Sequence, residues 1–185
     1  MEVELSELDE AWALGLAEAE ARARASGRSD IAQYLALRSS NDLIRKIARD
    51  WLLTMFVSAA GEANRAGAAI QISADEAHRF KVGNAGMRGS RLGLKRGVRQ
   101  ILVEVGWPRT PSDGFIRGGG LACGNIKHVG IKTADEELRL VVNSEGTPVW
   151  LVQMKHGEPQ ELHETNVRDH VAILLNDSRN PPVRS

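Results

Sequence analysis

The 185 residues of the chain suit a single domain, and a composition of 42% hydrophobic and 26% charged residues is typical of a soluble globular protein. The formal net charge of zero argues against a general nucleic-acid coat protein, because such proteins are basic overall. No apolar run approaches the roughly 20 residues that cross a bilayer, and the single cysteine, Cys123, cannot form a disulfide within the chain. We therefore expect a cytoplasmic protein that does not bind a membrane.

The N-terminal residues have the spacing of an amphipathic helix. Ser6 is a predicted N-cap, and Trp12 and Leu16 lie on one helical stripe. Gly27 supplies a residue that commonly follows the end of a helix. The pattern predicts a first helix over about 6–26.

Two further helices are expected before the sequence pattern changes. Ser29 can cap a short helix over about 29–38, and Asn41 can cap a longer one over about 41–65. The apolar residues of the longer helix cover more than one face, which indicates burial on several sides. We expect this helix to be the central one of the fold.

After Gly67 the apolar residues recur every second position, as in half-buried strands. The segment 98–107 shows this most clearly, because Ile101, Val103 and Val105 share one face while Gln100 and Glu104 lie on the other. Helices followed by a run of strands predict an α+β fold with a curved antiparallel sheet. We expect one domain, 1–185, with three parts. The helical part is 1–67, and the sheet part is 68–162 with about six or seven strands over about 69–162. The C-terminal part is 163–185 and contains a last helix over about 164–176.

Charge is sorted along the chain although it sums to zero. Residues 77–132 hold eleven Lys and Arg but only two acids, Glu104 and Asp113, and they also hold twelve of the eighteen glycines. The segments before and after are acidic. A basic, glycine-rich centre between acidic flanks indicates either an anion-binding surface or parts that neutralise each other.

The cations of the central segment fall on the polar side of the expected strands. If those strands are neighbours, the cations would line one face of the sheet and attract phosphates. The alternatives are an outer face in contact with solvent or one neutralised by the acidic first helix. A nucleic acid is possible but not favoured, since aromatic residues for base stacking are nearly absent. The cations in question are Arg79, Lys81, Arg91, Lys95 and Arg99.

The longest stretch without periodicity, residues 106–120, is a second candidate site. Long loops are often functional, a guanidinium suits carboxylate or phosphate, and glycines let backbone N–H groups approach an anion. The alternative is that Asp113 pairs with one arginine while the loop covers an open end of the sheet. The predicted ligand-binding residues are Arg109, Asp113, Phe115, Arg117, Gly118, Gly119 and Gly120, together with His128 beyond the loop.

Motifs of known enzyme classes are missing from the sequence, and no cofactor or metal is expected. His163 and His170 lie two helical turns apart, too far for one ion. Cys123 and His128 would point to opposite faces of a strand, so Cys123 is expected to be a buried, inert thiol.

The sequence thus favours a binding or interaction domain over an enzyme. Its partner would be an anionic ligand or an acidic protein, held near Arg109 and Arg117. The enzyme alternative uses an atypical site near 107–128, with Asp113 or His128 as the acid or base. A third alternative is a purely structural oligomer subunit, and the sequence leaves the oligomeric state open.

Overall fold

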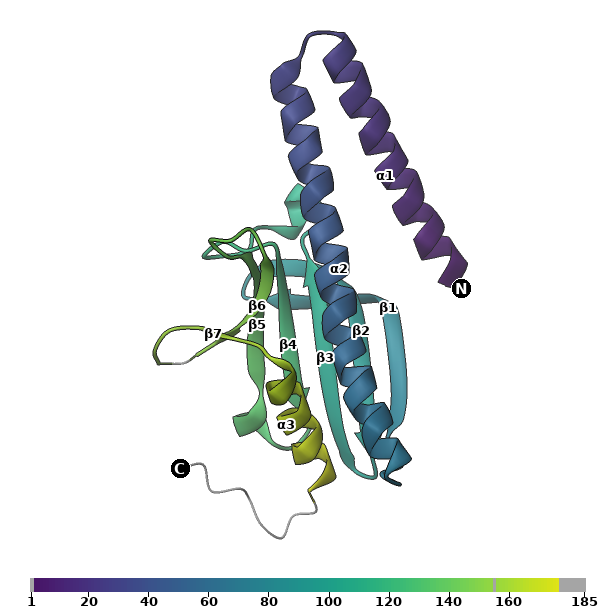
Figure 1. Cartoon of the computed structure of the whole chain (residues 1–185), viewed down its shortest axis with the longest axis vertical. Helices are drawn as coiled ribbons and strands as arrows, with labels where there is room; N and C mark the ends of the chain where they lie inside the picture. The colour runs from purple at the N-terminus through teal and green to yellow at the C-terminus, as the bar shows by residue number, and fades with distance from the viewer. Residues whose placement is uncertain (1, 155, 177–185) are drawn as a thin grey trace. The chain divides into compact units, whose positions relative to one another are not determined.

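The computed structural model describes residues 2–154 and 156–176 and has an α+β architecture (Figure 1). It contains three helices and one antiparallel sheet, which confirms the predicted fold class. The helices are α1 (Glu2–Ala25), α2 (Ser29–Arg65) and α3 (Glu164–Leu175). Compact units divide at Ile47 and Ala48, so α1 and the start of α2 form one unit and all later elements form the other. That residues 1–185 make one domain stays a prediction.

The second predicted helix and the third are one continuous helix, so the expected break near residue 39 is wrong. Residues 29–60 contain neither glycine nor proline, and Ser, Asn and Asp can also occupy helix interiors. Asp42, the neighbour of the predicted cap Asn41, accepts a hydrogen bond from Arg45 at 2.7 Å on the next turn of the continuous helix. The helix ends at Arg65, two residues before Gly67 takes a φ of 90°.

The sheet contains seven strands in chain order, each antiparallel to its neighbours. Such a meander needs only short turns, and two of these contain Gly83 and Gly97 with positive φ. The strands are β1 (Gln71–Val82), β2 (Ala85–Arg96), β3 (Arg99–Trp107), β4 (Ala122–His128), β5 (Glu136–Val142), β6 (Pro148–Gln153) and β7 (Gln160–Glu161).

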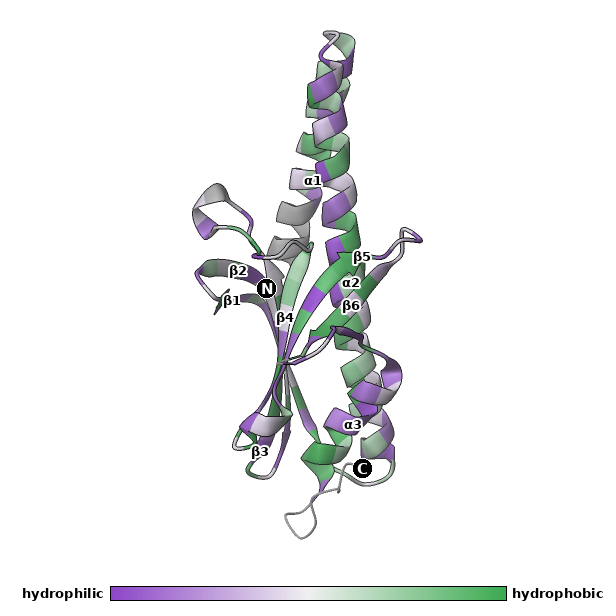
Figure 2. Ribbon diagram, turned by 90° about the vertical axis from the view of Figure 1, so that its left-hand side faces the viewer, coloured by the Kyte–Doolittle hydropathy of each residue, from purple (hydrophilic) through white to green (hydrophobic). Residues whose placement is uncertain are grey.

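The C-terminal part of α2 and the whole of α3 lie on the same face of this sheet (Figures 1 and 2). Trp150 on β6 donates a hydrogen bond from Nε1 to the carbonyl oxygen of Ala48, at 3.0 Å. We call this the helix-covered face and the other the open face. The core between helices and sheet includes Leu52, Phe56, Leu94, Ile101, Val103, Ile126, Leu140, Val167 and Leu174, all buried.

A bulge in β1 changes which of its residues face the helices. The pairing of β1 with β2 shifts register between Asp75 and His78. Because side chains alternate along a strand, the extra residue reverses the facing of every later odd-numbered position. Asp75 therefore points to the open face, whereas Arg79 points to the same side as the core residues of β2.

Within the described part of the chain, no helix has the length and apolar character that crossing a lipid bilayer requires.

Candidate anion-binding site

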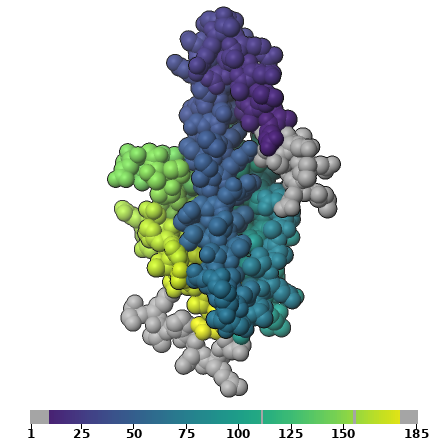
Figure 3. All heavy atoms as spheres, turned by 45° about the vertical axis from the view of Figure 1, so that its right-hand side comes forward, coloured from purple at the N-terminus to yellow at the C-terminus, as the bar shows by residue number. Residues whose placement is uncertain are grey.

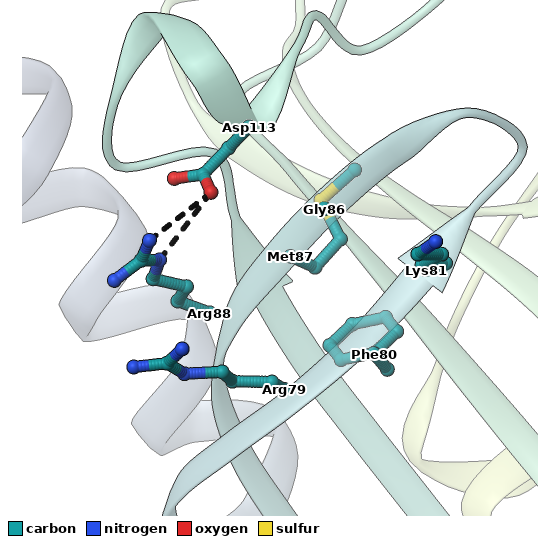
Figure 4. A pocket seen from close by; sticks show the side chains of 7 residues that line it. All are labelled: Arg79, Phe80, Lys81, Gly86, Met87, Arg88 and Asp113. Carbon is teal, nitrogen blue, oxygen red and sulfur yellow. Dashed lines mark hydrogen bonds and ion pairs between the residues drawn. The ribbon is translucent and has the colours of Figure 1, made fainter.

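The hairpin of β1 and β2 carries a hollow of about 250 Å³ at its turn end (Figure 4). Arg79 and Arg88 are direct cross-strand partners, and Figure 4 shows both side chains extending in the same direction. Lys81 pairs with Gly86, which has no side chain and so leaves space opposite the lysine. We call this the hairpin hollow; its lining residues are Arg79, Phe80, Lys81, Gly86, Met87, Arg88 and Asp113.

Asp113 enters the hollow from the loop between β3 and β4. Its Oδ2 accepts hydrogen bonds from the backbone N–H groups of Thr110 at 2.9 Å and Arg109 at 3.0 Å, and from Thr110 Oγ1 at 3.0 Å. Its Oδ1 faces Arg88, with Nη2 at 3.3 Å and Nε at 3.4 Å. The Thr110 backbone bond is the largest cause that lowers the pKa of Asp113, to about 2, so this carboxylate is charged at neutral pH.

The hollow carries more positive than negative charge. Arg79, Lys81 and Arg88 contribute three cations and Asp113 one carboxylate. Like charges that lie directly opposite each other on neighbouring strands repel and destabilise a sheet. Arg79 and Arg88 form such a cross-strand pair. The single carboxylate of Asp113, whose Oδ1 lies 3.3 Å from Arg88 Nη2, is outnumbered by these cations.

Arg109 is linked to the residues of the hollow by its contact with Trp107. The guanidinium carbon of Arg109 is 4.3 Å from the centre of the Trp107 ring, a cation–π contact. Trp107 in turn pairs with Arg88 across β2 and β3. The structure therefore brings together two predicted residues, Arg109 and Asp113, and adds the cations of the hairpin.

The other predicted loop residues lie outside the hollow. Phe115 is 84% exposed, and Arg117 is exposed as well. The three glycines all have positive φ and pass around a side chain of β5, because a Cβ on Gly118 or Gly120 would lie 2.7 or 2.8 Å from Arg139. Their conformation thus serves the packing of the loop against Arg139, whose Nη1 donates to the carbonyl oxygen of Gly118 at 3.2 Å.

His128 is not near the loop, and its grouping with those residues is wrong. It ends β4, at the opposite end of that strand from the loop, and pairs with the core residue Ile101. His128 and His170 are each only 4% exposed; His128 Nε2 lies 2.9 Å from His170 Nδ1, and His170 Nε2 lies 3.1 Å from Glu136. Burial, followed by the charge of His170, lowers the pKa of His128 to about 4.

The expectation that the central cations line one sheet face is also wrong. Arg91 and Lys95 alternate with the core residues of β2 and point to the open face, opposite to Arg79. Arg96 and Arg99 instead bind the end of α3, donating to the carbonyl oxygens of Leu175 at 2.7 Å and Ile173 at 3.0 Å. The β1 bulge and the docking of α3 could not be inferred from the spacing of the cations.

A second polar cluster, which the sequence did not indicate, lies on the open face. Glu104 is buried and contacts His78 at 2.7 Å, Lys127 at 2.6 Å and Asn125 at 3.3 Å. Burial raises the pKa of Glu104, but the hydrogen bonds from these three partners outweigh it and the net pKa is lowered. The carboxylate is thus satisfied by the sheet itself.

Cys123 is a buried free thiol, and burial raises its pKa. It points to the open face while His128 points to the core, which confirms that the two cannot form a catalytic pair. In the part of the chain that is described, no three His, Cys, Asp or Glu side chains are placed to hold a metal ion.

Of the charged residues that line the hollow, Arg88 is the one that the sequence analysis missed. The sequence signal that could have found it is the turn at Gly83. Counting the same number of residues outward from this turn on both strands places Arg88 opposite Arg79.

Comparison of the chain with protein-family models, with curated proteins and with solved structures finds no significant match.

Proposed function

We propose that this chain is a binding domain for a small organic anion, held in the hairpin hollow. The observation that carries the proposal is the excess of charge there: Arg79, Lys81 and Arg88 against the single carboxylate of Asp113. Guanidinium groups bind carboxylates and phosphates through paired, charge-assisted hydrogen bonds. An anion between Arg79 and Arg88 would relieve the repulsion between them.

The size and walls of the hollow define the class of ligand. A volume of about 250 Å³ lies just below the usual range of pockets for drug-sized ligands, so the ligand is small. Phe80 and Met87 also border the hollow, but their side chains point to the other face of the hairpin and pack with Ala85 and Cys123. A phosphate or carboxylate on a small molecule fits the volume and the charge of the hollow.

The catalytic alternative finds no support from the two side chains assigned to it. Asp113, with a pKa of about 2, is a weak base near neutral pH. His128 is enclosed between the sheet and α3, away from the hollow.

The proposal is tested by titrating the full chain with phenyl phosphate and following backbone amide signals by NMR. We expect shifts centred on Lys81, Gly86 and Arg88, whereas uncharged phenol should produce none of them. The double variant Arg79→Ala/Lys81→Ala should bind at least about tenfold more weakly, because each lost charged hydrogen bond contributes about 1.5–3 kcal/mol.

Arg117→Ala is the matched control. It removes an exposed cation that lies outside the hollow, in the loop between β3 and β4 that also carries Asp113. Its affinity should equal that of the unsubstituted chain. Absence of any shift with phenyl phosphate, or equal losses in Arg117→Ala and in the double variant, would refute binding at this hollow.

A further inference from the structure

The carboxylate of Asp113 uses its two oxygens differently. Oδ2 accepts three hydrogen bonds within the loop, from the backbone N–H groups of Arg109 and Thr110 and from the hydroxyl of Thr110. Oδ1 faces Arg88 across the hairpin hollow at 3.3 and 3.4 Å (Figure 4), longer than the about 2.7–2.9 Å of a charge-assisted N–H···O bond. Because a carboxylate has about four acceptor positions, Oδ1 can accept a further donor.

Gly86 carries no side chain that could cover Oδ1. A Cβ at this position would lie 3.6 Å from Oδ1 of Asp113, in ordinary contact, so a longer side chain would lie over the oxygen. The residue opposite Gly86 on β1 is Lys81. The hollow therefore presents a negatively charged acceptor beside its three cations.

The hairpin that carries the hollow is accessible from solvent. β1 is an edge strand of the sheet, and each of its residues is exposed or half-buried. In Figure 3 the atoms of β1 lie at the molecular surface beside the C-terminal part of α2. A small solute can therefore reach this strand without any movement of the core.

We infer that the ligand of the hairpin hollow is a small zwitterion, a phosphate monoester that also carries an ammonium group. This inference rests on the proposed function and adds the class of ligand. The phosphate binds Arg79 and Arg88, and the ammonium donates to Oδ1 of Asp113. A ligand with negative charge alone is repelled by Asp113, whereas an ammonium is attracted to it and supplies three N–H donors.

The charges of the hollow also define the two groups of the ligand. A phosphate monoester has a charge of about −1.5 to −2 at pH 7, which suits three cations better than the single charge of a carboxylate. Oδ1 of Asp113 and the bound phosphate contact the same guanidinium, that of Arg88. The ammonium and the phosphate of the ligand are therefore close together, as on a chain of two or three carbons.

The test compares phosphoethanolamine with ethyl phosphate, which lacks only the ammonium group, by NMR titration of the full chain. We expect phosphoethanolamine to bind at least about fivefold more tightly. A site that responded to negative charge alone would instead prefer ethyl phosphate, which has the larger net negative charge. In Asp113→Asn the preference should disappear, because phosphoethanolamine binds more weakly and ethyl phosphate more tightly.

Asp75→Asn is the matched control, since it removes a carboxylate on the open face, and it should keep the preference. Equal affinity for the two compounds, tighter binding of ethyl phosphate, or a preference that persists in Asp113→Asn would overturn the inference while leaving the hollow as an anion site. Failure of both compounds to bind would overturn the proposed function as well.

The headgroup of phosphatidylethanolamine carries the same two groups, so the source of the ligand needs a separate measurement. Its phosphate is a diester with one negative charge, which suits three cations less well than a monoester. We expect the full chain to remain in solution when vesicles of phosphatidylethanolamine and phosphatidylcholine are sedimented. Sedimentation with these vesicles that is lost in Asp113→Asn would assign the site to a lipid and overturn the assignment to a free monoester.

Discussion

Asp113 limits the charge of the hairpin hollow, because its carboxylate lies where part of a bound anion would otherwise bind Arg88. In Asp113→Asn the side-chain oxygen can still accept the N–H groups of Arg109 and Thr110, so the loop is preserved. The net charge of the lining side chains rises by one. We expect phenyl phosphate to bind about three- to tenfold more tightly.

The matched control for this change is Asp75→Asn, which removes a carboxylate that pairs with Arg91 on the open face. Its affinity for phenyl phosphate should not change. If Asp113→Asn bound no more tightly than the unsubstituted chain in the same NMR titration, the carboxylate would not compete with the ligand.

Gly120 illustrates a different residue-scale constraint, the close approach of the loop to β5. A methyl group there would lie 2.8 Å from Arg139 Cγ and 3.0 Å from the carbonyl oxygen of Leu140, on a backbone with a φ of +106°. We expect Gly120→Ala to lower the free energy of unfolding by about 2–4 kcal/mol, from contact and backbone strain together. Chemical denaturation measures this loss.

Gly119→Ala separates the two causes, because its φ is +81° but nothing lies within 4 Å of the added carbon. It should cost only the backbone strain, about 1–2 kcal/mol. Equal losses at both positions would show that contact with Arg139 is irrelevant.

At the scale of an element, α3 is held at its C-terminus by two cations of the sheet, of which Arg99 was among those considered for an anion-binding face. Arg96 donates to the carbonyl oxygen of Leu175, and Arg99 to that of Ile173. Cations at this end also interact favourably with the helix dipole. In Arg96→Ala we expect faster amide hydrogen exchange across 164–175, by about tenfold or more for the loss of one charged hydrogen bond.

Arg91→Ala is the control for α3, since Arg91 lies on the opposite face of the same strand. It should leave exchange in α3 unchanged. Unchanged exchange in Arg96→Ala as well would contradict the anchoring role.

The packing of α3 on the sheet also makes stability depend on pH through His128. Its pKa is lowered from 6.5 to about 4 in the folded chain, so between these values the unfolded chain binds more protons. Stability should therefore fall as the pH drops from about 6.5 to about 4, by an amount on the order of 3 kcal/mol. The charged or titratable groups around it are His170, Asp135 and Glu136.

His128→Gln tests this dependence, because glutamine can still bind His170 but does not titrate. The loss of unfolding free energy between pH 7 and pH 4.5 should be clearly smaller in the variant. An equal loss in both chains would assign the pH dependence to other groups.

At the scale of the whole molecule, the class of fold follows from local patterns in the sequence. The alternation of Ile101, Val103 and Val105 predicts a half-buried strand, and these three are buried in the core. The predicted helical break was wrong because Asn41, the expected cap, can also lie inside a helix, and residues 29–60 of α2 contain neither glycine nor proline.

The candidate site could be predicted only in part, because it depends on pairing between strands. Arg109 and Asp113 share one loop, so sequence proximity was enough to group them. Arg79 and Arg88 meet only through the hairpin register, and one bulged residue in β1 decides which face they share. The cations that are grouped in the sequence do not form one surface patch, because side chains along a strand point alternately to opposite faces of the sheet.

The most direct test of the anion site is a crystal structure of the full chain with phenyl phosphate. We expect the phosphate to lie within hydrogen-bonding distance of Arg79 and Arg88, on the side of the hairpin to which both side chains point. A hollow that stays empty at saturating ligand, or a phosphate bound only at other cations such as Lys95 or Arg117, would contradict it.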